Sequence, residues 1–99
     1  MPIRLEPIHP GEILSAEFMK PLGLSQSKLA RDLDVPVARV HDILRGRRGI
    51  TADTALRLAT YFRTTPDLWM NLQARYDLKR AERAAGKSIR AQVRPRKAA

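Results

Sequence analysis

Apolar residues recur at helical spacing in five stretches of this chain, and residues that start or stop helices bound each stretch. The first predicted helix begins at Pro10 and stops at residues 21–23, which include a proline and a glycine. Ser25 is a good N-terminal cap for the second helix. Pro36 opens the third, and Gly46, which suits a left-handed cap, ends it. The first half of the chain therefore predicts three short helices joined by tight turns.

Two further helices are predicted in the second half. Thr51 caps the fourth, and Thr65, which precedes a proline and an acid, caps a fifth that runs to about residue 85. Few apolar residues follow, so the last stretch is predicted to lack a fixed fold. The pattern indicates an all-α fold of five helices, divided into an N-terminal arm (1–8), a helical domain (9–85) and a disordered basic tail (86–99).

The net charge of the chain indicates which class of partner it binds. The chain has 19 Lys and Arg residues against 10 Asp and Glu, for a net charge of +9. Such an excess favours a polyanionic partner, nucleic acid before anionic lipid. Residues 79–99 hold eight basic residues and one acid, and so carry +7 of that charge. Any binding surface in the helical domain must therefore be found from geometry.

Several functional classes lack their signatures. The chain has no cysteine, and His9 and His41 have no partners at metal-ligand spacing, so no metal is expected. There is no glycine-rich phosphate loop, nucleophile elbow or clustered carboxylate pair, so neither an enzyme nor a cofactor is predicted. Without a signal-peptide pattern, or an apolar run of the roughly 18 residues that span a bilayer, a cytoplasmic protein is expected.

The third helix has two unlike faces. With Val40 at the centre of the buried side and steps of about 100° per residue, Pro36, Ile43 and Leu44 share its apolar face. Residues 38, 42 and 45, which are alanine, aspartate and arginine, lie opposite. A small residue among polar ones permits close approach to base edges, which arginine and aspartate can read by hydrogen bonds. This face predicts contact with a DNA major groove.

The neighbouring segments fit the same interpretation. The second helix would use its N-terminal N–H groups and the Gln26 amide to hold a phosphate, while the third is presented to the groove. Arg47 and Arg48 follow where the DNA backbone would pass. The predicted DNA-binding residues, within a helix-turn-helix motif at about 25–45 and just after it, are Ser25, Gln26, Ser27, Val37, Ala38, Arg39, His41, Asp42, Arg45, Arg47 and Arg48.

A simpler interpretation stands beside this one. Arg39 and Asp42 are three residues apart and could form an ion pair on an ordinary solvated helix face. For the third helix alone this interpretation is favoured. The combination of cap, glutamine, apolar helix, tight turn, polar outer face and Arg-Gly-Arg-Arg shifts the balance to DNA binding.

A family resemblance adds to this. The stretch LSQSKLARDLDVPVARVHDILRG resembles the helix-turn-helix of lambda-repressor-like (Xre-type) domains. HPGEIL, PLGLSQ, RGRRGITADTALRLATYF and TPDLWMNLQARYDL, in that order, are similar to HigA-type antitoxins, also called VapI-like regulators. The similarity spans about residues 9–78. It departs at Asp34, where such turns often have glycine, and in the basic tail beyond Arg80. Aspartate tolerates the left-handed conformation, so the turn is expected to survive.

The resemblance implies a five-helix lambda-repressor-like domain that forms a homodimer and binds an operator upstream of its own operon. It also implies a HigB-type toxin that cleaves mRNA at the ribosome and is neutralised by complex formation. By position, phosphate holding falls on Gln26, base reading on residues 37–45, and backbone contact on Arg47 and Arg48. These roles agree with those assigned from the helix geometry.

Two interfaces are predicted. The fifth helix, at about 66–85, is expected to form the dimer through Trp69, Leu72 and Tyr76, although such a stripe more often belongs to a core. Residues 1–19 carry a net charge of −2 in a basic chain, and an RNA-cleaving toxin should be basic. The hypothesis is that this segment docks the toxin through Glu6, Glu12 and Glu17.

Two alternatives remain open. One is a stand-alone helix-turn-helix regulator without a protein partner, which a neighbouring reading frame for a small basic protein would argue against. The other is a module that binds RNA or an anionic surface through the tail. Removing residues 86–99 would abolish its binding, but would only weaken operator binding and its salt dependence.

Overall fold

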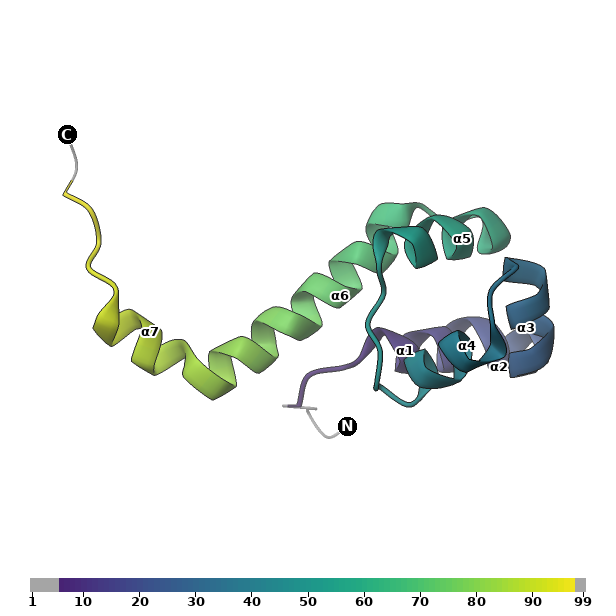
Figure 1. The fold of residues 1–99 in the computed structure, drawn as a ribbon, viewed down its shortest axis with the longest axis horizontal. Coiled ribbons are helices and arrows are strands. Elements are labelled where there is room, and N and C mark those ends of the chain that lie inside the picture. The colour runs from purple at the N-terminus through teal and green to yellow at the C-terminus, as the bar shows by residue number, and fades with distance from the viewer. Residues whose placement is uncertain (1–5, 98–99) are drawn as a thin grey trace.

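Five helical rods make up residues 6–97, the part of the chain that this computed structural model describes (Figure 1). No strand occurs within that range, and the prediction of an all-α, five-helix fold is confirmed. The first rod joins three segments and the fifth joins another three. In chain order the segments are α1 (Pro10–Ile13), the π-helix η1 (Leu14–Met19), α2 (Lys20–Leu22), α3 (Gln26–Leu33), α4 (Val37–Leu44), α5 (Ala52–Phe62), α6 (Pro66–Ala81), the π-helix η2 (Glu82–Gly86) and α7 (Lys87–Gln92).

Local capping chemistry sets the starts of three rods. The side-chain oxygens of Ser25, Thr51 and Thr65 each accept a hydrogen bond from a backbone N–H three residues ahead. Gly23 and Gly46 adopt left-handed backbone conformations after α2 and α4, with φ of 62° and 74°. These predicted boundaries are confirmed because each depends on neighbouring residues alone.

Pro21 does not stop the first rod as predicted. The helix continues through it to Leu22 and ends at Gly23. The wider turns of η1 come just before, and there the Lys20 N–H donates to the Ser15 carbonyl, five residues back. Proline lacks an N–H, and its position directly after this altered hydrogen-bond pattern lets the helix accommodate it.

The core lies where the first four rods meet the start of α6. Phe18 from η1, Phe62 from α5 and Trp69 from α6 form an aromatic cluster, in which the Phe18 ring lies 4.9 Å from Phe62 and 5.0 Å from Trp69 between centroids. Around it pack the largest fully buried aliphatic side chains, which are Leu14, Leu29, Val40, Ile43 and Leu58. This core holds α3 and α4 in a fixed relation to each other.

The predicted dimer role of Trp69 is wrong. Its side chain is 0% exposed, and its Nε1 donates to Thr64 Oγ1 at 2.9 Å, so the whole indole is used within one subunit. Leu72 is half-buried and packs against the same core. Tyr76 is also half-buried, one turn further along α6. The first turns of α6 therefore contribute Trp69 and Leu72 to the core of the subunit.

The fifth rod extends further than predicted. α6 leaves the domain, and η2 and α7 continue it into a C-terminal arm, residues 78–97, which projects from the body (Figure 1). Residues 87–92, expected to belong to a disordered tail, form α7, while 93–97 have no regular structure. An ion pair of 2.7 Å between Glu82 and Arg90 spans the junction over Gly86, where a Cβ would collide with the Glu82 carboxylate. Residues 98–99 of the tail and 1–5 of the N-terminal arm lie outside the described part.

Candidate nucleic-acid interface

A tight turn sets α3 against α4. α3 buries Leu29, Ala30 and Leu33, and its end is closed by Asp34 in the left-handed conformation, with φ of 58°. The prediction that aspartate would preserve this turn is confirmed. Both N–H groups of the turn are satisfied, because Asp34 donates to the Arg31 carbonyl and Val35 to the Ala30 carbonyl. The turn is therefore rigid enough to hold the next helix at a set angle.

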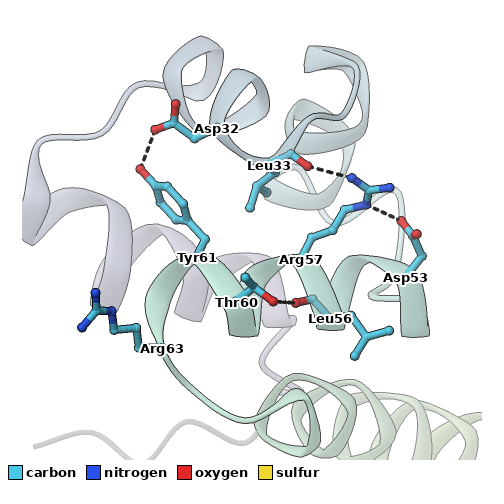
Figure 2. Close-up of a pocket in the computed structure, with 8 residues that line it drawn as sticks. All are labelled: Asp32, Leu33, Asp53, Leu56, Arg57, Thr60, Tyr61 and Arg63. Atoms are coloured by element: carbon cyan, nitrogen blue, oxygen red, sulfur yellow. Dashed lines mark hydrogen bonds and ion pairs between the residues drawn. The ribbon is translucent and has the colours of Figure 1, made fainter.

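Arg57 of α5 clamps the same turn from outside. Figure 2 shows its guanidinium between α5 and the end of α3. There Nη1 donates to the Leu33 carbonyl at 2.9 Å, and Nε donates to the Asp53 carboxylate at 2.9 Å. This places positive charge at the C-terminal end of α3, where the helix dipole favours it. The hydrogen bond from Arg57 also lowers the pKa of Asp53, which keeps the pair ionised.

α4 presents the outer face that the sequence predicts. Val40 and Ile43 are each 2% exposed, whereas Ala38 and Arg45 are exposed on the opposite side. Asp42 shares that side and is half-buried. The predicted apolar face is narrower than expected, because Pro36 precedes the helix as its cap and is exposed. Val37, 50% exposed, widens the outer face at its first turn.

The arginines around α4 are not equivalent. Arg39 donates to Asp53 of α5 at 2.9 Å, so the predicted alternative of an Arg39–Asp42 pair does not form. Asp42 instead faces Arg48 at 3.7 Å across the turn that ends α4. Arg45 is exposed and makes no ion pair with any of residues 6–97. Arg45 is therefore the cation of the outer face most available to a ligand.

Gln26, the first residue of α3, lies beside His41 of α4. Gln26 Oε1 is 3.1 Å from His41 Nδ1, which joins the first residue of α3 to the middle of α4. When His41 donates in this contact, the Gln26 oxygen is occupied and its NH₂ group keeps two donors for an outside acceptor. Ser25 and Ser27 flank this amide and are exposed. Ser25 Oγ is engaged with the Lys28 N–H, as a cap requires.

The acidic N-terminal residues divide between two roles. Glu6 and Glu17 are exposed. Glu12 is exposed too, but its carboxylate accepts a hydrogen bond of 3.2 Å from the His9 N–H and completes a capping box at α1. Of these three acids, Glu6 and Glu17 therefore have carboxylates that do not cap a helix in this structure.

The described residues offer neither a metal site nor a membrane-spanning helix. Among residues 6–97 there is no cluster of three or more His, Asp or Glu side chains placed to hold a metal ion. Within the same part of the chain, every helix is too short or too polar to cross a bilayer. The outer face of α4 and its surroundings remain the most developed candidate surface.

Known proteins share this architecture. The helix-turn-helix family HTH_3 matches residues 16–69, more than half of the chain. Virulence-associated protein I of Dichelobacter nodosus is 56% identical over 75 residues, which cover 76% of this chain and 69% of that protein. A solved antidote protein of the HigA family from Coxiella burnetii is 52% identical, with a TM-score of 0.88 over 92% of this chain and 99% of that one.

This chain belongs to the HigA family of helix-turn-helix proteins. Antitoxin HigA of Pseudomonas aeruginosa, solved with its higBA promoter, is 49% identical, with a TM-score of 0.88 over 91% of this chain and 98% of that one. The resemblance noted in the sequence is therefore confirmed at the level of family and fold.

In this HigA-family chain, sequence reasoning missed the residues that hold the motif from a distance. Arg57 and Asp53 fix the turn from α5, and Gln73 of α6 accepts a hydrogen bond of 2.7 Å from the Ile50 N–H. The Asp53–Arg57 ion pair follows from their i,i+4 spacing, but the Leu33 carbonyl that Arg57 also contacts lies 24 residues away and no local pattern indicates it.

Proposed function

We propose that this chain is the antitoxin of a type II toxin–antitoxin system. It binds operator DNA upstream of its own operon as a dimer and represses transcription, and it binds and neutralises an mRNA-cleaving toxin of the HigB type. The observation that carries the proposal is the P. aeruginosa HigA solved with its promoter, which shares this fold over 98% of its length. Here α4 offers the exposed outer face that such binding needs.

The outer face of α4 serves as the base-reading surface. Ala38 lets the helix approach the floor of a major groove, and Arg45 reaches a base edge or the flanking phosphate. The Gln26 amide, whose oxygen contacts His41, donates to the DNA backbone next to the positive end of α3. Arg47, exposed beyond α4, adds a second backbone contact. Two such surfaces related by a twofold axis read an inverted repeat.

Replacing Arg45 with alanine tests base reading. Loss of a guanidinium that contacts a base should reduce discrimination between the operator and a single-base variant by about 1–3 kcal/mol. Fluorescence anisotropy with labelled duplexes at fixed salt measures it. Arg75→Ala, which removes an exposed arginine from α6, is the control and should leave the discrimination unchanged. If Arg45→Ala discriminates between the operator and the single-base variant as well as the parent does, Arg45 does not read a base.

The C-terminal arm supplies the dimer surface in place of Trp69. Leu78, Ile89 and Val93 are 70%, 49% and 62% exposed, an unusual set of apolar side chains on one projecting segment. α7 is the last segment of the fifth rod and follows η2 directly, so this end of the rod has few contacts with the rest of the subunit. A second copy of the chain that covers this arm stabilises it and pairs the two α4 helices.

Leu78→Asp is expected to break the dimer. Burying an unpaired carboxylate at the subunit contact should raise the dimer dissociation constant by at least about 10-fold. Sedimentation velocity over a range of concentrations measures the shift. Leu22→Asp, at a 64% exposed leucine in the first rod, is the matched control and should leave the dimer intact. A dimer that tolerates Leu78→Asp would place the interface elsewhere.

Charge complementarity supports a toxin-docking surface on the N-terminal segment. Glu6 and Glu17 are exposed acids on a basic chain, and an RNA-cleaving toxin is expected to be basic.

Changing both Glu6 and Glu17 to lysine should weaken the toxin complex by at least about 10-fold, as measured by calorimetry. Glu12 is left unchanged because it caps α1. Gln92→Lys adds a charge on α7 and is expected to have little effect; equal loss in both variants would contradict this docking surface.

Purification from the native host separates the antitoxin from a stand-alone regulator. The proposal expects a small basic protein to copurify with the tagged chain and to degrade mRNA when produced alone. An operator-binding chain that copurifies with no such protein would support the regulator instead.

A further inference from the structure

Asp42 is an acid on the surface that the proposed function presents to DNA. It is the single acid among residues 36–48, which also contain four arginines. The side chain is half-buried and lies on the outer face of α4, one turn after the exposed Ala38. A carboxylate at this place repels the phosphates of an approaching duplex, so it costs affinity unless it makes a favourable contact of its own.

The backbone of Asp42 already secures the turn that ends α4. Its carbonyl accepts hydrogen bonds from the Arg47 N–H at 2.9 Å and from the Arg48 N–H at 3.3 Å. The Gly46 N–H donates to the Ile43 carbonyl, and Gly46 adopts the left-handed conformation that closes such a helix end. All of these bonds join main-chain atoms. The turn therefore does not need a carboxylate at position 42.

The Asp42 carboxylate has one charged partner within residues 6–97. Its Oδ2 lies 3.7 Å from Arg48 Nη2, and neither oxygen takes part in a hydrogen bond or another ion pair within that range. At this distance the contact is an ion pair and not a hydrogen bond, so both oxygens keep their capacity to accept from a ligand. Arg48 thus offsets the negative charge and restrains the carboxylate without occupying it.

The neighbours of Asp42 on α4 leave room for such a ligand. Ala38, four residues earlier, has no side chain beyond its Cβ and is exposed. Arg45, three residues later, is exposed as well and brings a second positive charge to the same face. A carboxylate between Arg45 and Arg48 approaches phosphates at a lower cost than an isolated one, because the two cations attract the DNA.

The four bases offer different edges to an acceptor in the major groove. Guanine shows two acceptor atoms, thymine shows an acceptor and a methyl group, and adenine shows an acceptor beside its amino group. Cytosine alone shows an amino donor without an acceptor next to it. A carboxylate is therefore attracted to the edge of cytosine and repelled by the acceptor atoms of the other three bases.

We propose that Asp42 is a specificity-determining residue, which selects cytosine at one position of each operator half-site while Arg48 holds its carboxylate in place. This inference rests on the proposed function, because it names the base that the outer face of α4 selects. It also separates two neighbouring arginines. Arg48 is a positioning residue that acts through Asp42, whereas Arg47 contacts the DNA backbone.

The base preferences of matched variants test the proposal. The probe is a set of duplexes from the region upstream of the chain's own gene, in which each base pair of one half-site is varied in turn. Competition anisotropy at fixed salt measures their affinities. At one position the parent should bind cytosine about 10-fold more tightly than the other bases. Asp42→Asn should move this preference to adenine, because an asparagine amide pairs with the N6 and N7 atoms of adenine.

Control variants separate base selection from net charge. Asp67→Asn removes the same charge from an exposed acid of α6 and should leave every base preference unchanged. Arg48→Ala should weaken the preference for cytosine at the position that Asp42 reads, whereas Arg47→Ala should weaken binding to all the duplexes alike. In an Asp42→Ala background, Arg48→Ala should have no further effect on the preference at that position. All variants should melt close to the parent, since the turn is held by main-chain bonds.

Two results would overturn the inference and leave the proposed function intact. One is a parent chain that binds its operator without a preference for cytosine at any position. The other is an Asp42→Asn variant that keeps every base preference of the parent, which would show that Asp42 only adjusts the net charge. A parent chain that binds the upstream duplex no better than an unrelated one would instead overturn the proposed function.

Discussion

Replacing Trp69 with alanine is expected to lower the free energy of unfolding by about 3–5 kcal/mol, the range for deleting a large buried aromatic side chain. The indole is 0% exposed and contacts Phe18 and Phe62 within the core. Its removal leaves a cavity at the junction of η1, α5 and α6 and strands the Thr64 hydroxyl that accepts its N–H. Because this junction supports α3 and α4, loss of the fold also abolishes DNA binding.

Urea denaturation followed by circular dichroism measures this loss. Leu56→Ala, which shortens a 58% exposed side chain on α5, is the control and should change stability by no more than about 0.5 kcal/mol. If Trp69→Ala lowers the free energy of unfolding by less than about 1 kcal/mol and dissociates the proposed dimer, Trp69 belongs to the subunit interface instead.

Replacing Ala38 with glutamate is expected to weaken operator binding by at least about 100-fold, because it adds both bulk and a negative charge where the helix meets DNA. Ala38 lies on the exposed side of α4, opposite Val40 and Ile43. Glutamate is a good helix former, so the fold should keep its stability. The loss should extend to non-specific DNA, since a carboxylate repels phosphates of any sequence.

The matched control is Ala74→Glu, the same change at an exposed position on α6. Anisotropy titrations at one salt concentration compare the two variants with the parent, because affinity for DNA depends steeply on salt. If Ala38→Glu and Ala74→Glu weaken binding equally, the effect is one of net charge and α4 does not enter the groove.

Features of the fold that depend on neighbouring residues could be predicted from sequence. Ser25, Thr51 and Thr65 cap their helices through backbone groups three residues away. The two faces of α4 follow from helical periodicity, so the burial of Val40 and the exposure of Ala38 needed no knowledge of the rest of the chain. Most of the candidate DNA surface belongs to this class.

The features that were missed depend on distant partners. The apolar spacing of Trp69 on α6 is the same for a core residue as for a subunit contact, and only the position of Phe18 and Phe62 separates the two. Likewise, the role of Arg57 depends on the Leu33 carbonyl at the end of α3. α7 was missed because a basic composition predicts disorder, whereas the Glu82–Arg90 pair joins it to η2.

Mapping of the operator complex by NMR tests the central claim most directly, using a duplex from upstream of the chain's own gene. The largest amide shift changes should fall on Gln26 and on residues 37–45, followed by the loop that carries Arg47. Shift changes confined to α7 and residues 93–97, with α4 unaltered, would show that the basic C-terminal arm binds the polyanion and that the helix-turn-helix does not.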